Sequence, residues 1–348
     1  MANYIGDNIF KITFSATLIL GGSLLFAYFR MPLPWLLGAL IAAAISRALI
    51  YKELAISEFW RTPFIVVIAW AVGASVSRGA FAQILDSPLI IAILCCSALV
   101  GSTFSYVVFR YVGRFEKADA FLACLPAGIT ETFLIAERNQ LNTSSVIVAH
   151  TVRLVSSVMV IPFILPTQSG TQNINMSLEI IPSIAQFTVF TIAVLSVIIG
   201  RSIKLPAAVF LAPVIAVTCL ALSPISIDGP PSSWLIVSQI IIGSMLGFEV
   251  AKAAQSSFRY FGLSVVASII TLAIVVAIAF SASSLLSLNF PFLLLATTPG
   301  GVSEMSLISL SLGISAGAII SLHLLRIFII LGLLSVIGSK LTYVENRK

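Results

Sequence analysis

The chain is organised around the stretch Thr298-Pro299-Gly300-Gly301-Val302-Ser303-Glu304-Met305. A similar stretch, Leu125-Pro126-Ala127-Gly128-Ile129-Thr130-Glu131-Thr132, lies 173 residues earlier. Both copies place a proline and glycines, which break helices, just ahead of a hydroxyl residue and an acid. The repeated order of these residue types indicates an internal duplication, and it directs the search for function to the two copies.

The same offset holds further along the chain. His150 corresponds to His323, and Arg153 corresponds to Arg326, each 173 residues apart, and these are the two histidines of the protein. A weaker match near the start of each half aligns two short stretches at an offset of 174, Arg30-Met31-Pro32 and Lys204-Leu205-Pro206. Small changes of offset are what loop insertions produce in duplicated halves.

Composition indicates a polytopic membrane protein. Of 348 residues, 59% are hydrophobic and 9% are charged, and the mean hydropathy is +1.11. A soluble domain needs far more charge. The net charge of +6 is modest and sits at segment ends, which fits lipid headgroups better than nucleic acid.

Twelve apolar segments can be drawn, six in each half. They run approximately over 9–29, 33–50, 63–77, 88–109, 118–138, 143–165, 179–199, 205–222, 234–248, 260–281, 290–312 and 316–337. We therefore expect an all-α membrane protein built of two homologous repeats, 8–166 and 178–338, of five to six transmembrane segments each. The stretch 166–177 is the expected linker. The third segment of each half, 63–77 and 234–248, is short for a full span.

The positive charges predict how the repeats are oriented. Basic joints lie at Arg47–Arg61 and Arg110–Lys117 in the first half, and at Arg201–Lys204 and Lys252–Arg259 in the second. These are opposite pairs of joints, so the charge swaps sides between the halves. That swap favours inverted-topology repeats. Strict inversion needs an odd number of crossings in each half, so one segment per half, the short third, is expected not to cross.

The fifth segment of each half should be a broken helix near the bilayer midplane. Pro126 and Gly128 interrupt the first, and Pro299, Gly300 and Gly301 interrupt the second. Inside lipid, the freed backbone groups must find protein, water or ligand. A half-helix N-terminus favours an anion, whereas unwound carbonyls favour a cation. The alternative is a purely structural kink, since proline and glycine are common in membrane helices.

Acids follow both breaks. Glu131 and Glu304, each directly after a hydroxyl residue (Thr130 and Ser303), lie close to mid-membrane depth. A charge there costs about 2.5–3.5 kcal/mol, so it normally faces a cavity or a partner. A proton carrier or cation ligand is one interpretation of these acids, and an interhelical ion pair is the other.

His150 with Arg153, and His323 with Arg326, are three residues apart near the middle of the sixth segments. That spacing puts both side chains on one helical face. A mid-span arginine needs a carboxylate or an anionic ligand nearby. It therefore either binds an anion or forms a latch with the acid of the preceding segment. No metal-ligand cluster, nucleotide-binding loop or catalytic triad is visible, so no cofactor and no enzymatic activity are expected.

The paired motifs resemble a known family. Two halves with a P-[AG]-G-x-[ST]-E motif ahead of an H-x-x-R segment look like the AbrB-type integral membrane proteins, although Ala127 stands where the second half has Gly300. Such proteins are often labelled ammonia monooxygenase or regulator of gene expression, and they are unrelated to the small DNA-binding regulator of the same name. The resemblance implies transporter-like architecture with crossing broken helices. An oxidase would need metal ligands that two distant histidines do not supply.

The first functional hypothesis is a secondary transporter of a small, anionic solute in the bacterial inner membrane, with Arg153 and Arg326 at the anion and Glu131 and Glu304 coupling protons or sodium. The alternative is a membrane sensor or regulator of gene expression that binds a small ligand without turnover. The oxidase implied by the family label ranks last. The expected partners are the solute and the lipid bilayer, with no nucleic acid, and homo-oligomerisation is left open.

Overall fold

The chain is all-helical over the residues that its computed structural model describes. These are 2–50, 53–76, 88–126, 129–138, 140–165, 182–205, 207–224, 227–286 and 288–345, with side chains throughout except at 2–9, 129–131, 134, 138 and 331–345. Within these ranges every regular element is a helix. The predicted linker 166–177 and Gly128 lie outside the described residues.

The chain forms two compact units, and each draws helices from both sequence halves. Unit 1 comprises Met1–Phe81, Val158–Phe258 and Ser303–Gly317. Its main helices are α1 (Ala2–Tyr28), α2 (Pro34–Leu49), α3 (Glu58–Ala74), α9 (Ile184–Ser202), α10 (Ala208–Ala221), α11 (Ser232–Ser256) and nearly all of α14 (Val302–Ser311).

Unit 2 comprises Ala82–Ser157, Arg259–Val302 and Ala318–Lys348. Its main helices are α5 (Pro88–Val107, continuing as a π-helical turn over Val108–Val112), α6 (Lys117–Cys124), α7 (Ile129–Arg138), most of α8 (Thr143–Ile164), α12 (Phe258–Leu286), α13 (Phe290–Thr297) and most of α15 (Ala316–Glu345). The expected repeats, 8–166 and 178–338, are therefore divided between the units and do not coincide with them.

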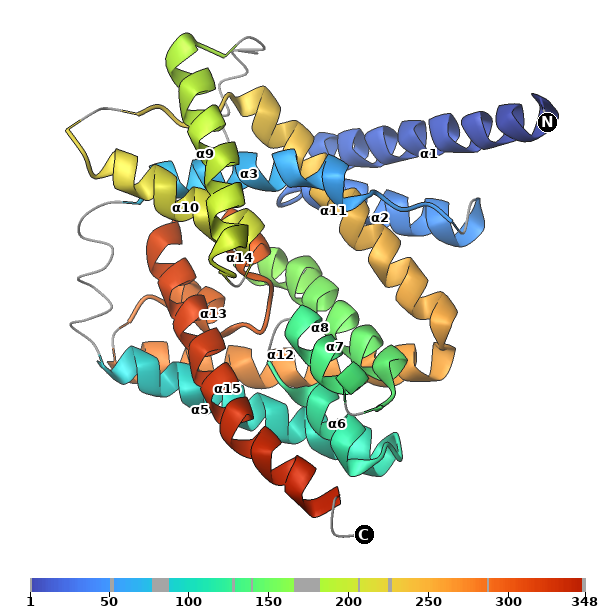
Figure 1. Ribbon diagram of the computed structural model, residues 1–348, viewed down its shortest axis with the longest axis vertical. Coiled ribbons are helices and arrows are strands. Elements are labelled where there is room, and N and C mark those ends of the chain that lie inside the picture. Colours follow the sequence, from blue (N-terminus) through green and yellow to red (C-terminus); the bar gives the residue numbers. More distant parts are fainter. Residues whose placement is uncertain are drawn as a thin grey trace. The chain divides into compact units, whose positions relative to one another are not determined.

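Helix bounds recur at the offset read from the sequence. Helix α6 begins at Lys117 and α13 at Phe290, 173 residues apart, and both contain eight residues. Helices α7 and α14 begin at Ile129 and Val302, again 173 apart, with ten residues each. The predicted fifth segments are thus two short helices each, and Figure 1 draws α6 and α7 as separate helices.

One length prediction was wrong. The segment predicted over 234–248 is helix α11, which contains 25 residues and continues to Ser256. The predicted segment stopped where the apolar run gives way to the joint that carries Lys252–Arg259, but Glu249 and Lys252 are residue types that favour helix, so both lie inside the last turns of α11. The third segment of the first half is short as predicted, because α3 contains 17 residues, and the second segments are shorter still, α2 with 16 residues and α10 with 14.

Six helices of the described residues are long and apolar enough to cross a membrane. They are Phe10–Tyr28, Pro88–Val112, Thr143–Ile164, Ile184–Ser202, Ser232–Ser256 and Phe258–Leu286. Shorter apolar helices cover Pro34–Leu49, Ala208–Ala221 and Ala316–Ile330. The chain is therefore a multi-pass membrane protein, and the inversion of its repeats stays a prediction.

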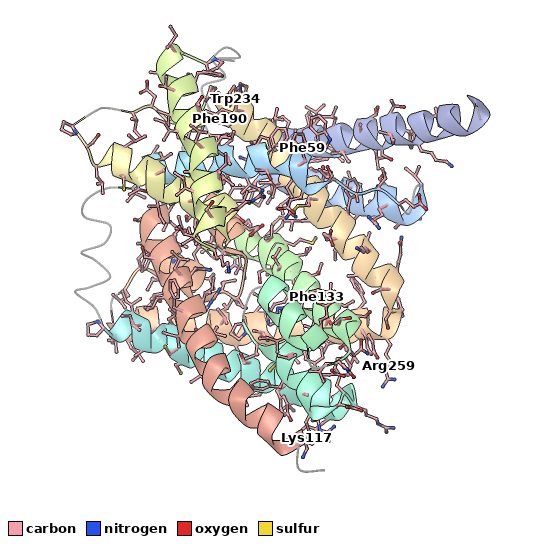
Figure 2. The ribbon with its side chains drawn as sticks, in the orientation of Figure 1. Phe59, Lys117, Phe133, Phe190, Trp234 and Arg259 are labelled. Atoms are coloured by element: carbon pink, nitrogen blue, oxygen red, sulfur yellow. The ribbon has the colours of Figure 1, made fainter. Side chains whose placement is uncertain are left out.

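Unit 1 packs through close helix approaches and an aromatic cluster. A Cβ added to Gly73 of α3 would stand 2.9 Å from Cβ of Val217 on α10, and one added to Gly243 of α11 would meet the carbonyl of Leu36 on α2. Small residues let membrane helices approach this closely. Phe190 and Trp234, labelled in Figure 2, meet edge to face with ring centroids 5.2 Å apart.

In unit 2, helices α5 and α12 pack side by side (Figure 1). The hydroxyl oxygens of Ser105 and Thr271 are 2.6 Å apart, and the hydroxyl of Thr271 also lies 3.5 Å from the carbonyl of Gly101. Because α5 comes from the first half and α12 from the second, this contact joins the two halves next to the broken helices.

Candidate functional site

Both breaks begin with the same backbone geometry. Leu125, just after α6, has ψ 133°, and Thr298, just after α13, has ψ 131°. Each precedes a proline, whose Cδ atom clashes with a helical preceding residue and drives it to extended backbone. The next helices begin at Ile129 and Val302. The predicted break is confirmed at Pro299–Gly301, which is non-helical.

In the first half, the His-x-x-Arg pair of α8 caps the end of α6. The Nε2 atom of His150 lies 3.0 Å from the carbonyl oxygen of Leu122, and Arg153 donates to the carbonyl of Cys124 at 3.4 Å. Arg153 also lies 2.7 Å from Nδ1 of His150. A guanidinium only donates and a carbonyl only accepts, so these partners assign the neutral Nε2–H tautomer.

The second half repeats the arrangement. The Nε2 atom of His323 lies 2.9 Å from the carbonyl oxygen of Leu295, and Nδ1 lies 3.2 Å from Arg326. Arg326 donates to the carbonyl of Thr298 at 2.8 Å and to that of Gly300 at 3.4 Å. The last carbonyls of a helix lack intrahelical donors and lie at the negative end of its dipole. The histidine and arginine therefore satisfy the groups that each break exposes.

The two breaks line one small cavity in unit 2. Its volume is about 10 Å³, roughly the space of a single water. Pro126 and Arg153 of the first half and Pro299 and Arg326 of the second all line it. The family resemblance implied crossing broken helices, and Pro126 and Pro299 do lie together at this cavity.

Ser157 ties the first half to the second break. Its hydroxyl donates to the carbonyl of Arg153 at 2.9 Å and lies 3.3 Å from the carbonyl of Pro299. The sequence offered no signal for this role, because the corresponding position in the second half is Ile330. The polar residues that α5 contributes to the cavity, Ser97, Ser102 and Ser105, were also missed, although the spacing of Ser97 and Ser105 along the helix could have indicated them.

One hydrogen-bond donor of Arg326 has no acceptor among the described residues. Its side chain is only 5% exposed, and its Nε–H has no hydrogen-bond partner among the described residues. A buried donor without an acceptor costs about 1–3 kcal/mol. Arg326 therefore combines a full charge, burial and an unused donor at the edge of the cavity.

The acid of the second copy belongs to unit 1. Glu304 is the third residue of α14 and is 7% exposed. It accepts a hydrogen bond of 2.9 Å from the hydroxyl of Ser303 and one from its own backbone amide. Within unit 1, the positive charge of Arg61 also interacts electrostatically with the carboxylate of Glu304. A carboxylate in the first turn complements the helix dipole, so Glu304 has local partners; its predicted pairing with an arginine of the motif stays a prediction.

For the acid of the first copy, Glu131, the structure describes the backbone alone. Thr130 and Glu131 lie in the first turn of α7, and their side chains fall outside the described residues. Gly301 ends the second break, one residue before α14 begins. Of the predicted site residues, the prolines and arginines thus gather at the cavity, the histidines bond to the arginines, and Ser303 and Glu304 lie in the other unit.

Comparison with known proteins adds a family and one relative. A family model described as "Transition state regulatory protein AbrB" matches residues 35–341. The chain is also 21% identical over 369 aligned positions to the uncharacterised protein YhjN of Bacillus subtilis (strain 168), covering 98% of this chain and 96% of that protein. The family match extends into both halves of the chain and includes both copies of the motif.

Proposed function

The chain belongs to the AbrB family, and we propose that it is a secondary transporter, without enzymatic activity, that moves a small anionic solute across the bacterial inner membrane. The observation that carries the proposal is the pair of arginines, one from each half, that line one cavity between two helix breaks. Two like charges held this close inside a membrane protein are costly unless an anion balances them.

The backbone chemistry favours an anion over a cation at this point. The carbonyls that a sodium ion would need are those exposed by the breaks. Leu122 and Leu295 already accept from histidines, and Thr298 already accepts from Arg326. The group that remains without a partner among the described residues is a hydrogen-bond donor, the Nε–H of Arg326. Coupling to protons or sodium is assigned to the acids Glu131 and Glu304, which lie on the helices that follow the breaks.

In this conformation the cavity has room for about one water molecule. A solute can pass only if the two breaks separate, which is what alternating movement of broken helices does in transporters with internal repeats. The close approach of the Ser157 hydroxyl to the carbonyl of Pro299 is one contact that such a movement must exchange. We accordingly expect an anion to bind at the arginines and to require movement of the breaks for release.

Binding and flux measured together test the proposal. The full chain, purified in detergent, is screened by thermal shift against chloride, phosphate, formate and acetate, and each stabilising anion is then assayed for uptake into proteoliposomes. Arg153→Gln and Arg326→Gln should each abolish the stabilisation and the uptake. The matched control is Arg201→Gln, which removes an exposed arginine paired with Glu58 at 3.0 Å.

The outcomes separate the functional classes. Stabilisation without uptake in any direction would favour the ligand-binding sensor over the transporter. Unchanged stabilisation in both motif variants would remove the arginines from the site. No response to any anion would overturn the proposal altogether.

A further inference from the structure

We propose that the solute of this transporter is a monocarboxylate with an apolar body, whose carboxylate meets Arg326 while its body fills a second, larger pocket beside the helix breaks. This inference rests on the proposed function, since it takes the same arginine as the anion site. It goes further by assigning the chemical class of the solute.

The pocket lies in unit 2 and has a volume of about 370 Å³. Cavities of roughly 300–1,000 Å³ hold small organic ligands. Its walls come from α5, α6 and α15, with the large apolar side chains Leu94, Leu99, Tyr106, Phe121, Ile329 and Ile330. An inorganic anion would leave this apolar surface without a partner, whereas a hydrocarbon body would cover it.

Arg326 is the charged residue among the described residues that line this pocket. It also lines the small cavity between the breaks, as do Cys124 and Pro126. The two spaces therefore share a wall, and Arg326 is part of it. The Nε–H of this side chain is buried and has no acceptor among the described residues, so a carboxylate that reaches it would satisfy it.

Charge complementarity and pocket chemistry together select the ligand. A guanidinium at one end favours a carboxylate, because a hydrogen bond between two charged groups is stronger than one between neutral groups. Apolar walls favour a body without further charge or hydrogen-bonding groups, because such groups would be desolvated without partners. A dicarboxylate or a sugar acid is therefore disfavoured, and a branched-alkyl or aryl monocarboxylate is favoured.

The experiment measures apparent affinity by thermal shift for acetate, butyrate, hexanoate and phenylacetate, with hexanamide and phenylacetamide as neutral matches. Affinity should rise up to about fourfold for each methylene that becomes buried, and the amides should bind more weakly than the acids. Arg326→Gln should abolish the preference for the acids. Oleate delivered in vesicles tests a membrane source of the same chemistry, and preferential binding of oleate would support the carboxylate class with the bilayer as its source.

Two neighbouring cysteines give a matched pair of pocket variants. Cys95 lines the pocket and Cys96 is exposed outside its lining. Cys95→Trp should remove the gain with chain length and leave acetate binding intact, while Cys96→Trp should change neither. If Cys95→Trp does not fold, Leu99→Trp replaces it, since Leu99 lines the pocket and is 63% exposed.

Each contrary result has a distinct meaning. Arg326-dependent binding of acetate with no gain along the series would overturn this inference and leave the anion transporter standing. Equal gains for acids and amides that survive Arg326→Gln would also overturn it, because they indicate unspecific partitioning. No binding of any anion would overturn the proposed function as well.

Discussion

Arg326 donates a hydrogen bond of 2.8 Å to the carbonyl of Thr298, the residue that caps helix α13. The same carbonyl accepts from the backbone amide of Gly300 at 2.9 Å. Arg326 thus replaces the helical donor that Thr298 loses at the end of α13, while His323 replaces, at the carbonyl of Leu295, the amide that Pro299 lacks. The arginine of the motif is a structural part of the break as well as the candidate anion ligand.

The first prediction compares the two arginines as caps. Arg326→Gln should lower the free energy of unfolding by about 1–3 kcal/mol. The substitution removes the guanidinium that donates to the carbonyls of Thr298 and Gly300. Arg153→Gln should cost no more than about 1 kcal/mol, because its carbonyl contact is longer, at 3.4 Å. Melting temperatures in one detergent measure the difference. Equal losses of melting temperature in the two variants would show that the length of the arginine–carbonyl hydrogen bond does not determine how much each arginine stabilises the protein.

The second prediction concerns glycines with opposite surroundings. Gly243→Ala should destabilise the protein, since the added Cβ would meet the carbonyl of Leu36. Gly262→Ala should stabilise it by up to about 1 kcal/mol, because alanine is the better helix former and nothing lies within 4 Å of the new atom. Thermal melting of the two variants beside the parent checks the sign of each change, and a stable Gly243→Ala would contradict the close packing of α11 on α2.

The third prediction tests the contact between the halves in unit 2. The hydroxyl oxygens of Ser105 and Thr271 are 2.6 Å apart, so cysteines at both positions should reach disulfide geometry. With the four native cysteines replaced by serine, Ser105→Cys with Thr271→Cys should cross-link under mild oxidation. A protease site inserted within 166–177 turns the cross-link into a gel shift, because cleavage separates the halves only when no disulfide joins them.

The control for this cross-link is Phe104→Cys with Thr271→Cys. Phe104 precedes Ser105 on the same helix but is 50% exposed, so its side chain points away from α12. Cross-linking of the control at the same rate would mean that the assay reports collisions rather than the packing of α5 on α12.

The sequence predicted those features that have a local physical cause. The breaks follow from the proline-glycine pairs, and the helix bounds follow from apolar runs that end in polar joints. The register of His150 with His323 correctly indicated equivalent roles, since both bond to a carbonyl 28 positions earlier. The end of α11 was missed because Glu249 and Lys252 are charged yet favour helix.

Other features depend on contacts distant in sequence. The arginines bond to backbone carbonyls, and a carbonyl has no signature in the sequence, so they were expected to meet carboxylates or an anion. Ser157 contacts Pro299 across the two halves without a counterpart in the second repeat. The grouping of first-half and second-half helices into shared compact units also requires tertiary packing that periodicity alone does not specify.

The last prediction separates coupling from capping at Glu304. Its carboxylate accepts from Ser303 at 2.9 Å in the first turn of α14. A charge at this place contributes about 0.3–1 kcal/mol through the helix dipole, so Glu304→Gln should fold and lose at most that amount. If Glu304 also couples protons to transport, the pH dependence of uptake should flatten, because an amide cannot titrate. Glu58→Gln, an exposed acid paired with Arg201 in the same unit, should keep the parental profile. A folded Glu304→Gln with the parental pH profile would leave Glu304 as a helix cap and assign coupling elsewhere.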